Sequence, residues 1–493
     1  MPVNDLLIRR ARLVSLTASA PTTPVDLRVV AGRVAEIAPR LARSPGEEVV
    51  DVEGRWVMPG LWDHHVHMLQ WAQLLVRLDT SGTSGPAAVL DLVRSRLATE
   101  PGDAPVVGFG HRIATWPEQP TTAALDAVAG DRPVVLISGD AHHGWLSSAA
   151  LRMLGLTPRD GIVHEAEWFE AYARLSARPD ILAQGESAIA GAVQRAAALG
   201  VVGVTDFEFG GAYADWPARL ARGIGDLRVR AATYAEGLDE VIRGGRRTGD
   251  PLEDSGLVRM GPLKIISDGS LSTRTAYCCQ PYLGPGATDH PYGVLNTPPD
   301  ELRALLTRAH AAGLEIAVHA IGDAAVASAL DGFAATGARG SIEHSQLMAA
   351  DDIPRMARLG LVASVQPAHL IDDRDVAEVC WADRTERCFP LRAMTDAGIR
   401  LVFGSDAPVS PLDPWLEIAT AVRRSGDERG PWHPEQRLTV TEALAASTDG
   451  QGTVAVGARA DLVVLDVDPR RAAEERVPVA ATLLAGRFTH WAL

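Results

Sequence analysis

Cysteine is scarce in this sequence, with four residues among 493: Cys278, Cys279, Cys380 and Cys388. Two of them are adjacent, and none shows CxxC spacing. So few cysteines cannot form the disulfide framework typical of small secreted domains. A reducing cytoplasm is therefore the compartment that we expect.

Excess positive charge and long apolar runs are also missing. The formal net charge is −15 at pH 7, which argues against nucleic acid or an anionic membrane surface as partner, because both require a basic face. Arg9, Arg10 and Arg12 interrupt the first apolar segment, so it does not resemble a signal peptide. No stretch reaches the length needed to span a bilayer. These absences predict a cytosolic protein.

What the sequence does contain is ample material for a core. Hydrophobic residues make up 46% and charged residues 22%, as in soluble globular proteins. The length suits one large barrel and a smaller module. Residues 1–56 and 455–493 are both rich in Val, Leu and Gly, with short strand patterns and tight turns. We expect these two ends to form one small β-sandwich module, the alternative being two unrelated caps.

The middle of the chain, residues 57–454, alternates apolar strands with helical patterns such as 298–313 and 350–360. This alternation is typical of βαβ units and a parallel sheet. Eight candidate strands occupy residues 55–65, 200–207, 227–236, 261–269, 314–322, 340–346, 361–367 and 399–406. Eight units predict an α/β fold, a TIM-like (β/α)8 barrel, with a subdomain inserted at about 68–199.

Three histidines cluster in "VMPGLWDHHVH", at the end of the first candidate strand. Side chains alternate along a strand, so His65 and His67 face the same side, roughly 6.5–7 Å apart. Two imidazoles at that separation can bind one metal ion. The pair alone is weak evidence, since both could be ordinary strand histidines.

Further ligand-type residues end the later strands: Lys264 and Asp268, His319, Glu343 and His344, and Asp406. In a barrel these strand ends meet at one face. Lys264 is either a structural lysine paired with Asp268 or, with a pKa lowered by burial, an amine that takes up CO₂ and bridges two ions as a carbamate. Asp406 is either a turn residue or the acceptor of a proton from activated water.

Several segments together resemble one family. They are "VMPGLWDHHVH", "GPLKIISDGSLSTRTA", "IAVHAIGDAAV", "SIEHSQ", "VASVQPAHL" and "LVFGSDAPV". In this order they are similar to the amidohydrolase superfamily, and within it to the YtcJ-like, N-substituted formamide deformylase-like branch (amidohydrolase family 3). The resemblance extends over nearly the whole chain.

The resemblance implies roles for individual residues. The metal ligands would be His65, His67, Lys264, His319, His344 and Asp406. Lys264 would be the position that is carbamylated in binuclear members, and Asp406 the general base. The residues that shape the substrate site would be His142, Trp145, Asp268, Arg274 and His369, although packing or hydrogen bonding explains each of them about as well. His64 and Ser147 depart from the usual pattern, so the substrates of relatives are a weak guide.

The function that we expect is metal-dependent hydrolysis of an amide-like C–N bond in a small molecule. Asp406 would take a proton from water and return it to the leaving amine, while His319 or His142 would help to hold the oxyanion. The cofactor would be a divalent cation, with Zn²⁺ the first candidate and one or two ions left open. A hydrolytic deaminase is a weaker alternative, because Gly322 stands where that class has Glu. A non-catalytic binding protein on a degenerate barrel is a further alternative, and a homodimer stays open.

Overall fold

The computed structural model describes residues 5–16, 21, 23–113, 116–139, 143–284, 290–474 and 476–493. The chain divides into two compact units. Unit 1 comprises Met1–Met68 and Val193–Leu493, and unit 2 comprises Leu69–Ala192. Each unit is described by itself below.

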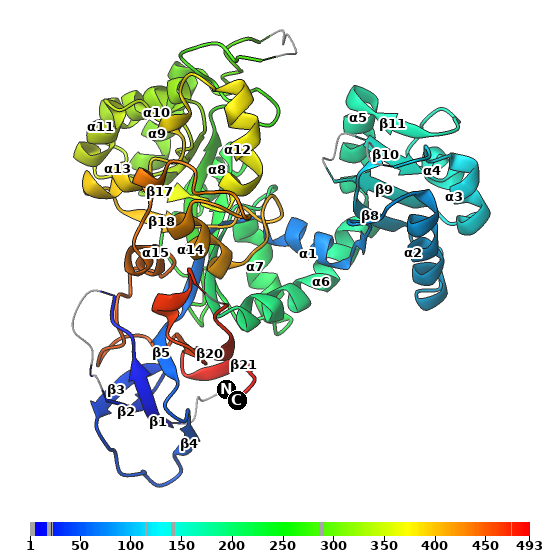
Figure 1. Ribbon diagram of the computed structural model, residues 1–493. Coiled ribbons are helices and arrows are strands. Elements are labelled where there is room, and N and C mark those ends of the chain that lie inside the picture. The colour runs from blue at the N-terminus through cyan, green and yellow to red at the C-terminus, as the bar shows by residue number, and fades with distance from the viewer. Residues whose placement is uncertain are drawn as a thin grey trace. The chain divides into compact units, whose positions relative to one another are not determined.

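Unit 1 contains an eight-stranded parallel sheet that is nearly closed into a barrel (Figure 1). Neighbouring strands pair in parallel from the first to the last. A parallel bridge between Val66 and Ala407 brings the segment after the last strand beside the end of the first. The strands are β6 (Leu61–Val66), β12 (Val201–Asp206), β13 (Arg228–Thr233), β14 (Val258–Ile266), β15 (Ile316–Ala320), β16 (Gly340–His344), β17 (Val362–Val365) and β18 (Leu401–Phe403). The predicted α/β barrel is confirmed.

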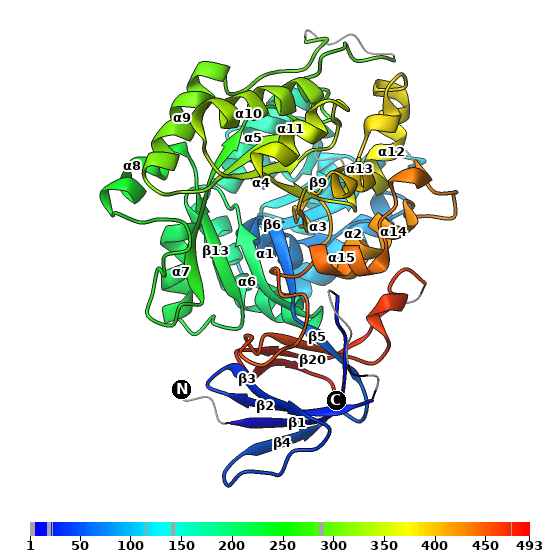
Figure 2. The same ribbon diagram turned by 90° about the vertical axis from the view of Figure 1, so that its left-hand side faces the viewer.

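Helices follow the barrel strands and pack around them (Figure 2). The two helices expected from the sequence correspond to α9 and α11, and Gly360 ends α11 with a φ of 66° in the left-handed region that favours glycine. The helices of this unit are α6 (Pro179–Ala198, which begins in unit 2), α7 (Ala212–Ala221), α8 (Ala235–Arg243), α9 (Pro299–Ala311), α10 (Asp323–Thr336), α11 (Asp352–Leu359), α12 (His369–Cys380), α13 (Leu391–Asp396), α14 (Pro414–Arg423) and α15 (Val440–Ala446).

Strands from both ends of the chain pair in one further sheet of unit 1 (Figure 2). Its strand order is β21-β20-β19-β5-β1-β2-β3, with β4 paired to β1. One apolar cluster contains Ile8 and Leu27 from the start of the chain and Leu462 and Leu483 from its end. The strands are β1 (Leu6–Leu13), β2 (Val25–Val30), β3 (Arg33–Ala38), β4 (Glu48–Asp51), β5 (Trp56–Pro59), β19 (Leu462–Leu465), β20 (Val479–Leu484) and β21 (Arg487–Trp491). A two-layered sandwich at these ends stays a prediction.

The sequence suggested one strand over residues 55–65, but the chain divides there. Residues 56–59 pair with β19 in the terminal sheet, whereas the barrel strand begins at Leu61. Gly60 makes the transition, and a Cβ atom at this position would lie 2.3 Å from Cγ1 of Val202. Only glycine lets the backbone pass this close to β12.

Unit 2 is a five-stranded sheet with helices and has its own apolar cores. The strand order is β11-β10-β9-β8-β7. Its strands are β7 (Leu78–Asp79), β8 (Val106–His111), β9 (Val134–Ser138), β10 (His143–Leu146) and β11 (Ile162–His164), and its helices include α1 (Met68–Val76), α2 (Pro86–Thr99), α3 (Thr122–Ala129), α4 (Ser148–Met153) and α5 (Glu165–Ser176). Within the described part of the whole chain, no helix is both long and apolar enough to cross a membrane.

Candidate metal centre

The carboxyl ends of the barrel strands bring the sequence-predicted histidines and Asp406 together. In a parallel barrel every strand ends at the same face, so residues far apart in the sequence meet there. Among the described residues there are two groups, and within each group the ligand atoms all lie within 4.8 Å of one another. One is His65, His67 and Asp406, and the other is His344, His369 and Asp406. The carboxylate of Asp406 is common to both.

Asp406 is placed at the centre of this arrangement by the turn that follows β18. Its backbone N–H donates to the carbonyl of His65 at 2.7 Å, and its φ is 56°. Its Oδ1 lies 3.4 Å from Nε2 of His65 and 3.4 Å from Nε2 of His67. Its Oδ2 lies 3.9 Å from Nε2 of His369. One carboxylate thus faces both groups of imidazoles.

In two of the imidazoles, hydrogen bonds determine which ring nitrogen can bind a metal. Nδ1 of His65 lies 2.7 Å from Oε2 of Glu343, a pure acceptor, so Nδ1 carries the proton and Nε2 keeps its lone pair. Nδ1 of His344 likewise lies 2.8 Å from Oε1 of Gln366. In both cases Nε2 is the nitrogen left to bind a metal.

His319 has the opposite tautomer. Its Nε2 lies 3.2 Å from the carbonyl oxygen of Gly269, so this nitrogen donates and Nδ1 has the lone pair. The ring lies 4.5 Å from that of His344, centroid to centroid. The lone pair on Nδ1 suits the predicted role of His319 as a metal ligand, although His319 belongs to neither of the two ligand groups.

The protonation states suit a divalent cation. Burial lowers the pKa of His65 and of His344, and it lowers the pKa of His319 to about 3. These rings are therefore neutral at physiological pH, as metal ligands must be. Burial alone would raise the pKa of Asp406, but the facing imidazoles outweigh it and hold the pKa well below its usual range. The carboxylate is therefore ionised.

At the metal centre, two buried histidine nitrogens have no hydrogen-bond partner among the described residues, Nδ1 of His67 and Nε2 of His369. Buried polar atoms are rarely left unpaired without a functional reason. Nε2 of His369 belongs to one of the two ligand groups. Burial would lower the pKa of His67, but the Asp406 carboxylate outweighs burial and raises it. The neutral imidazoles of His65, His319 and His344, an ionised carboxylate and an unpaired nitrogen together fit a bound divalent metal.

Lys264 is the only lysine of the chain, although arginine is abundant. It is 3% exposed, its Nζ lies 3.3 Å from Nε2 of His65, and it lies over the ring of Phe207 at 4.5 Å. Burial lowers its pKa to about 8, which increases the share of neutral amine at physiological pH.

The alternative pairing of Lys264 with Asp268 does not occur among the described residues. Asp268 instead accepts the backbone N–H groups of Tyr277, Ile321 and Gly322 at 2.9, 3.1 and 2.9 Å. It is fully buried, and its Oδ1 lies 3.4 Å from Nε2 of His319. Asp268 therefore holds the loop after β14 against the end of β15.

The other residues predicted to shape the substrate site are distributed differently. His369 joins the second ligand group, and Arg274 is half-buried in the turn after β14 with a φ of 55°. Trp145 lies in unit 2, is fully buried, and donates its indole N–H to the carbonyl of Thr121 at 2.9 Å. That contact is typical of core packing. His142 lies outside the described residues.

Sequence reasoning missed the supporting role of Glu343 and did not single out Gln366 or Phe209. Glu343 was noted only as a strand-end carboxylate, and its contact with His65 joins two barrel strands, β16 and β6, that do not pair with each other, so it could not be seen in the sequence. The adjacent His64 lies apart from both ligand groups, with Nε2 3.3 Å from the carbonyl of Thr448. One signal was available in the sequence, since the single lysine of the chain marks its own position as unusual.

An aromatic recess adjoins the metal centre. The ring of Phe209 stacks on His67 with centroids 5.2 Å apart, and it lies 5.2 Å from the ring of Tyr234. A pocket of about 540 Å³ is lined by these two aromatic residues together with Tyr213, Glu236 and Glu240, among others. Phe209 is 54% exposed, so this large apolar side chain is open to a substrate beside the proposed ligands.

A parallel barrel with histidines and a shared aspartate at its carboxyl end defines the class of metal-dependent hydrolases. The sequence matches the model of the amidohydrolase family over residues 48–490, and the chain belongs to this family.

Relatives of similar length support this assignment. The protein YtcJ of Bacillus subtilis (strain 168) is 27% identical over 470 residues, covering 86% of this chain and 87% of YtcJ. N-substituted formamide deformylase of Arthrobacter pascens is 26% identical over 532 residues, covering 95% and 94%. The crystal structure of an uncharacterized metal-dependent hydrolase from Pyrococcus furiosus superposes with a TM-score of 0.81 at 26% identity, covering 94% of this chain and all of that one.

Proposed function

We propose that this amidohydrolase cleaves an amide-like C–N bond of a small molecule, such as an N-formyl, N-acyl, carbamate or cyclic amide compound. The observation that carries the proposal is the single ionised carboxylate of Asp406, which faces histidines of both ligand groups. A base in contact with the metal ligands is what hydrolysis by activated water needs.

His65, His67, His319, His344 and Asp406 would hold the metal, with His369 and Lys264 beside them. When bound, a divalent cation supplies Lewis-acid activation of water and of the substrate carbonyl. We take Zn²⁺ as the first candidate, because imidazole nitrogen and carboxylate oxygen are its usual ligands.

Asp406 would act as the proton carrier of the reaction. Its carboxylate would accept a proton from the attacking water and return it to the leaving nitrogen, which departs as an amine. Glu343 would keep Nε2 of His65 directed at the centre throughout, because its hydrogen bond fixes the tautomer of the ring.

The substrate would place an apolar or aromatic group in the recess beside Phe209. An exposed aromatic ring next to the ligand His67 offers stacking to such a group. Because one relative is the N-substituted formamide deformylase of Arthrobacter pascens, N-formyl compounds are the first substrates to test.

We also propose that Lys264 becomes carbamylated. The amine is buried beside His65, its pKa is lowered to about 8, and only its neutral form reacts with CO₂. The carbamate would add an anionic oxygen ligand between two groups of histidines that share only Asp406.

Hydrolytic deamination is less favoured because of Gly322. A deaminase of this superfamily would carry Glu at that position, but a Cβ atom there would lie 2.1 Å from the carbonyl oxygen of Tyr277. This backbone contact leaves no room for a side chain without a shift of the loop. A non-catalytic barrel is disfavoured as well, because no predicted ligand position in the sequence is replaced by a residue that cannot bind a metal.

The test is a screen of metal-loaded protein against N-formyl, N-acyl, carbamate and cyclic amide compounds, with release of the amine measured. Activity should disappear with a chelator and return with Zn²⁺. Asp406→Asn should lower kcat on the order of 10²- to 10⁴-fold, the range for loss of a general base. A variant that keeps full kcat on the same substrate would refute the role of Asp406.

A further inference from the structure

A second pocket of unit 1 lies at the opposite end of the barrel from the metal centre. Its volume is about 400 Å³. Arg228 is the first residue of β13 and Arg259 the second of β14, whereas the metal ligands follow the carboxyl ends of their strands. The remaining wall includes Gly32 of the β2–β3 turn and Ala485 of the β20–β21 turn. These two turns are in close contact, since a Cβ atom at Gly32 would lie 3.1 Å from that of Ala485.

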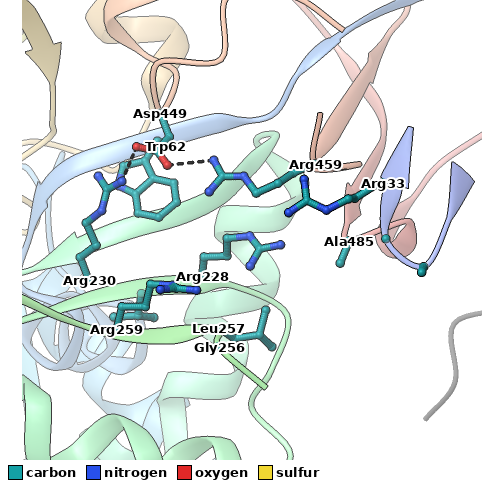
Figure 3. Close-up of a pocket in the computed structure, with 13 residues that line it drawn as sticks. Arg33, Trp62, Arg228, Arg230, Gly256, Leu257, Arg259, Asp449, Arg459 and Ala485 are labelled. Carbon is teal, nitrogen blue, oxygen red and sulfur yellow. Dashed lines mark hydrogen bonds and ion pairs between the residues drawn. The ribbon is translucent and has the colours of Figure 1, made fainter. Parts of the chain in front are cut away.

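Five arginines line this pocket: Arg33, Arg228, Arg230, Arg259 and Arg459. Figure 3 shows that they extend from several parts of the chain, with Arg228 and Arg230 both on β13, and that their guanidinium groups lie around the same space. This concentration of positive charge is unexpected in a chain whose formal net charge is −15.

The acidic residues that contact these arginines neutralise only part of the charge. Asp449 pairs with Arg230 and Arg459 (Figure 3). Asp461 pairs with Arg228 at 2.7 Å and with Arg459 at 3.1 Å. Five guanidinium groups therefore face two carboxylates.

Arg33 and Arg259 have no acidic partner among the described residues. Arg33 donates to the carbonyl of Gly457 at 2.8 Å, and Arg259 donates to the carbonyl of Gly249 at 2.7 Å. Both side chains belong to exposed residues, and most of the five N–H donors of each guanidinium stay available.

One arginine is also held rigidly in place. The guanidinium of Arg230 lies over the ring of Trp62, 4.6 Å from its centroid. Trp62 is 3% exposed, and its indole N–H donates to Oγ1 of Thr205. A fixed guanidinium needs little reordering when an anion binds, which favours affinity.

We propose that this arginine pocket binds the phosphate group of a small phosphorylated molecule. A phosphate monoester carries about −1.5 to −2 charges and three acceptor oxygens near neutral pH. Guanidinium groups that converge from several elements match a tetrahedral group with several oxygens better than a planar carboxylate. The pocket is larger than phosphate alone, which leaves space for the remainder of the molecule.

The test is calorimetric titration of the purified protein at low salt with inorganic phosphate, glycerol 3-phosphate and AMP, and with succinate as a carboxylate comparison. We expect saturable binding of at least one phosphate compound, with one molecule per chain, and weaker binding of succinate. Arg33→Gln/Arg259→Gln should bind that compound at least tenfold more weakly. Arg303→Gln, which removes one positive charge from an exposed position on α9 outside the pocket, should bind it as the native protein does.

A second variant is expected to bind more tightly, and misfolding can explain a loss of binding but not a gain. Asp449→Asn removes an acidic competitor of the ligand, so it should bind the phosphate compound more tightly than the native protein. Three results would each overturn the proposal: no saturable binding of any phosphate compound, equal binding by the double variant, or succinate binding as tight as that of phosphate.

Discussion

Oε2 of Glu343 lies 2.7 Å from Nδ1 of His65 and thereby directs Nε2 of this ring towards Lys264 and Asp406. Both side chains are 1% exposed. A carboxylate behind a ligand histidine fixes its tautomer and raises its basicity. The orientation of the first ligand therefore depends on a residue of a different strand.

Glu343→Gln should weaken metal binding without unfolding the protein. The amide oxygen can still accept the Nδ1 proton, but the negative charge is lost, and such changes typically cost about 10- to 100-fold in metal affinity. Competition with a chromophoric chelator measures this affinity. Ser341→Ala, which removes only the hydroxyl that donates to Glu343, should have a smaller effect. Unchanged affinity in Glu343→Gln would contradict the role assigned to the carboxylate.

Lys264→Ala should lower the metal content from about two ions per chain towards one or none, if the lysine is a bridging carbamate. Bicarbonate or short carboxylates should restore part of the activity. Because the chain has one lysine, protein incubated with ¹³C-bicarbonate should show a single side-chain carbamate signal in its NMR spectrum. A metal-replete protein without that signal, and with one ion per chain, would decide for a mononuclear centre.

The same lysine should make stability depend on pH in the metal-free protein. Burial lowers the pKa of Lys264 from 10.5 to about 8, a destabilisation of roughly 3 kcal/mol below pH 8. Between pH 8 and 10.5 the unfolded chain binds more protons than the folded chain, so this destabilisation decreases as pH rises. Lys264→Met should thus be more stable than the native protein at pH 7, with a smaller difference at pH 9.5. Urea unfolding at both pH values checks this, and a difference that grows with pH would contradict it.

Phe209→Ala should raise KM about tenfold for substrates with an apolar group, with a smaller change in kcat. The expected loss is one stacking contact, worth roughly 0.5–1.5 kcal/mol beyond the buried area. Because Phe209 is 54% exposed, the thermal stability and the metal content should stay close to those of the native protein. Steady-state kinetics with an N-benzyl and an N-methyl amide separate the two parameters. An unchanged KM for the apolar substrate would place its binding outside the recess.

The barrel could be predicted from the sequence because most of its strands are short apolar segments that alternate with helical patterns. Seven of the eight predicted strands lie where the sequence placed them. The first was predicted too long, because the chain crosses from one sheet to another at Gly60. His65, His67, His344 and Asp406 were predicted to lie together because strand ends of a barrel meet at one face, and each of them belongs to one of the two ligand groups.

Other features depend on contacts that the sequence does not encode locally. The hydrogen bond of Glu343 to His65 joins two strands that are not neighbours in the barrel sheet, and that of Gln366 to His344 depends on the register of β16 and β17. The tautomer of His319 depends on a backbone carbonyl of the loop after β14. The arginine pocket likewise arises from residues as far apart as Arg33 and Arg459.

The metal content of matched histidine variants tests the central claim most directly. His65→Ala and His67→Ala each remove one proposed ligand. The control, His64→Gln, changes the adjacent ring, which lies outside both ligand groups and is hydrogen-bonded to the carbonyl of Thr448. Elemental analysis should find metal in the native protein and in His64→Gln, and little or none in the two alanine variants. Full metal occupancy in His65→Ala or His67→Ala would contradict the account.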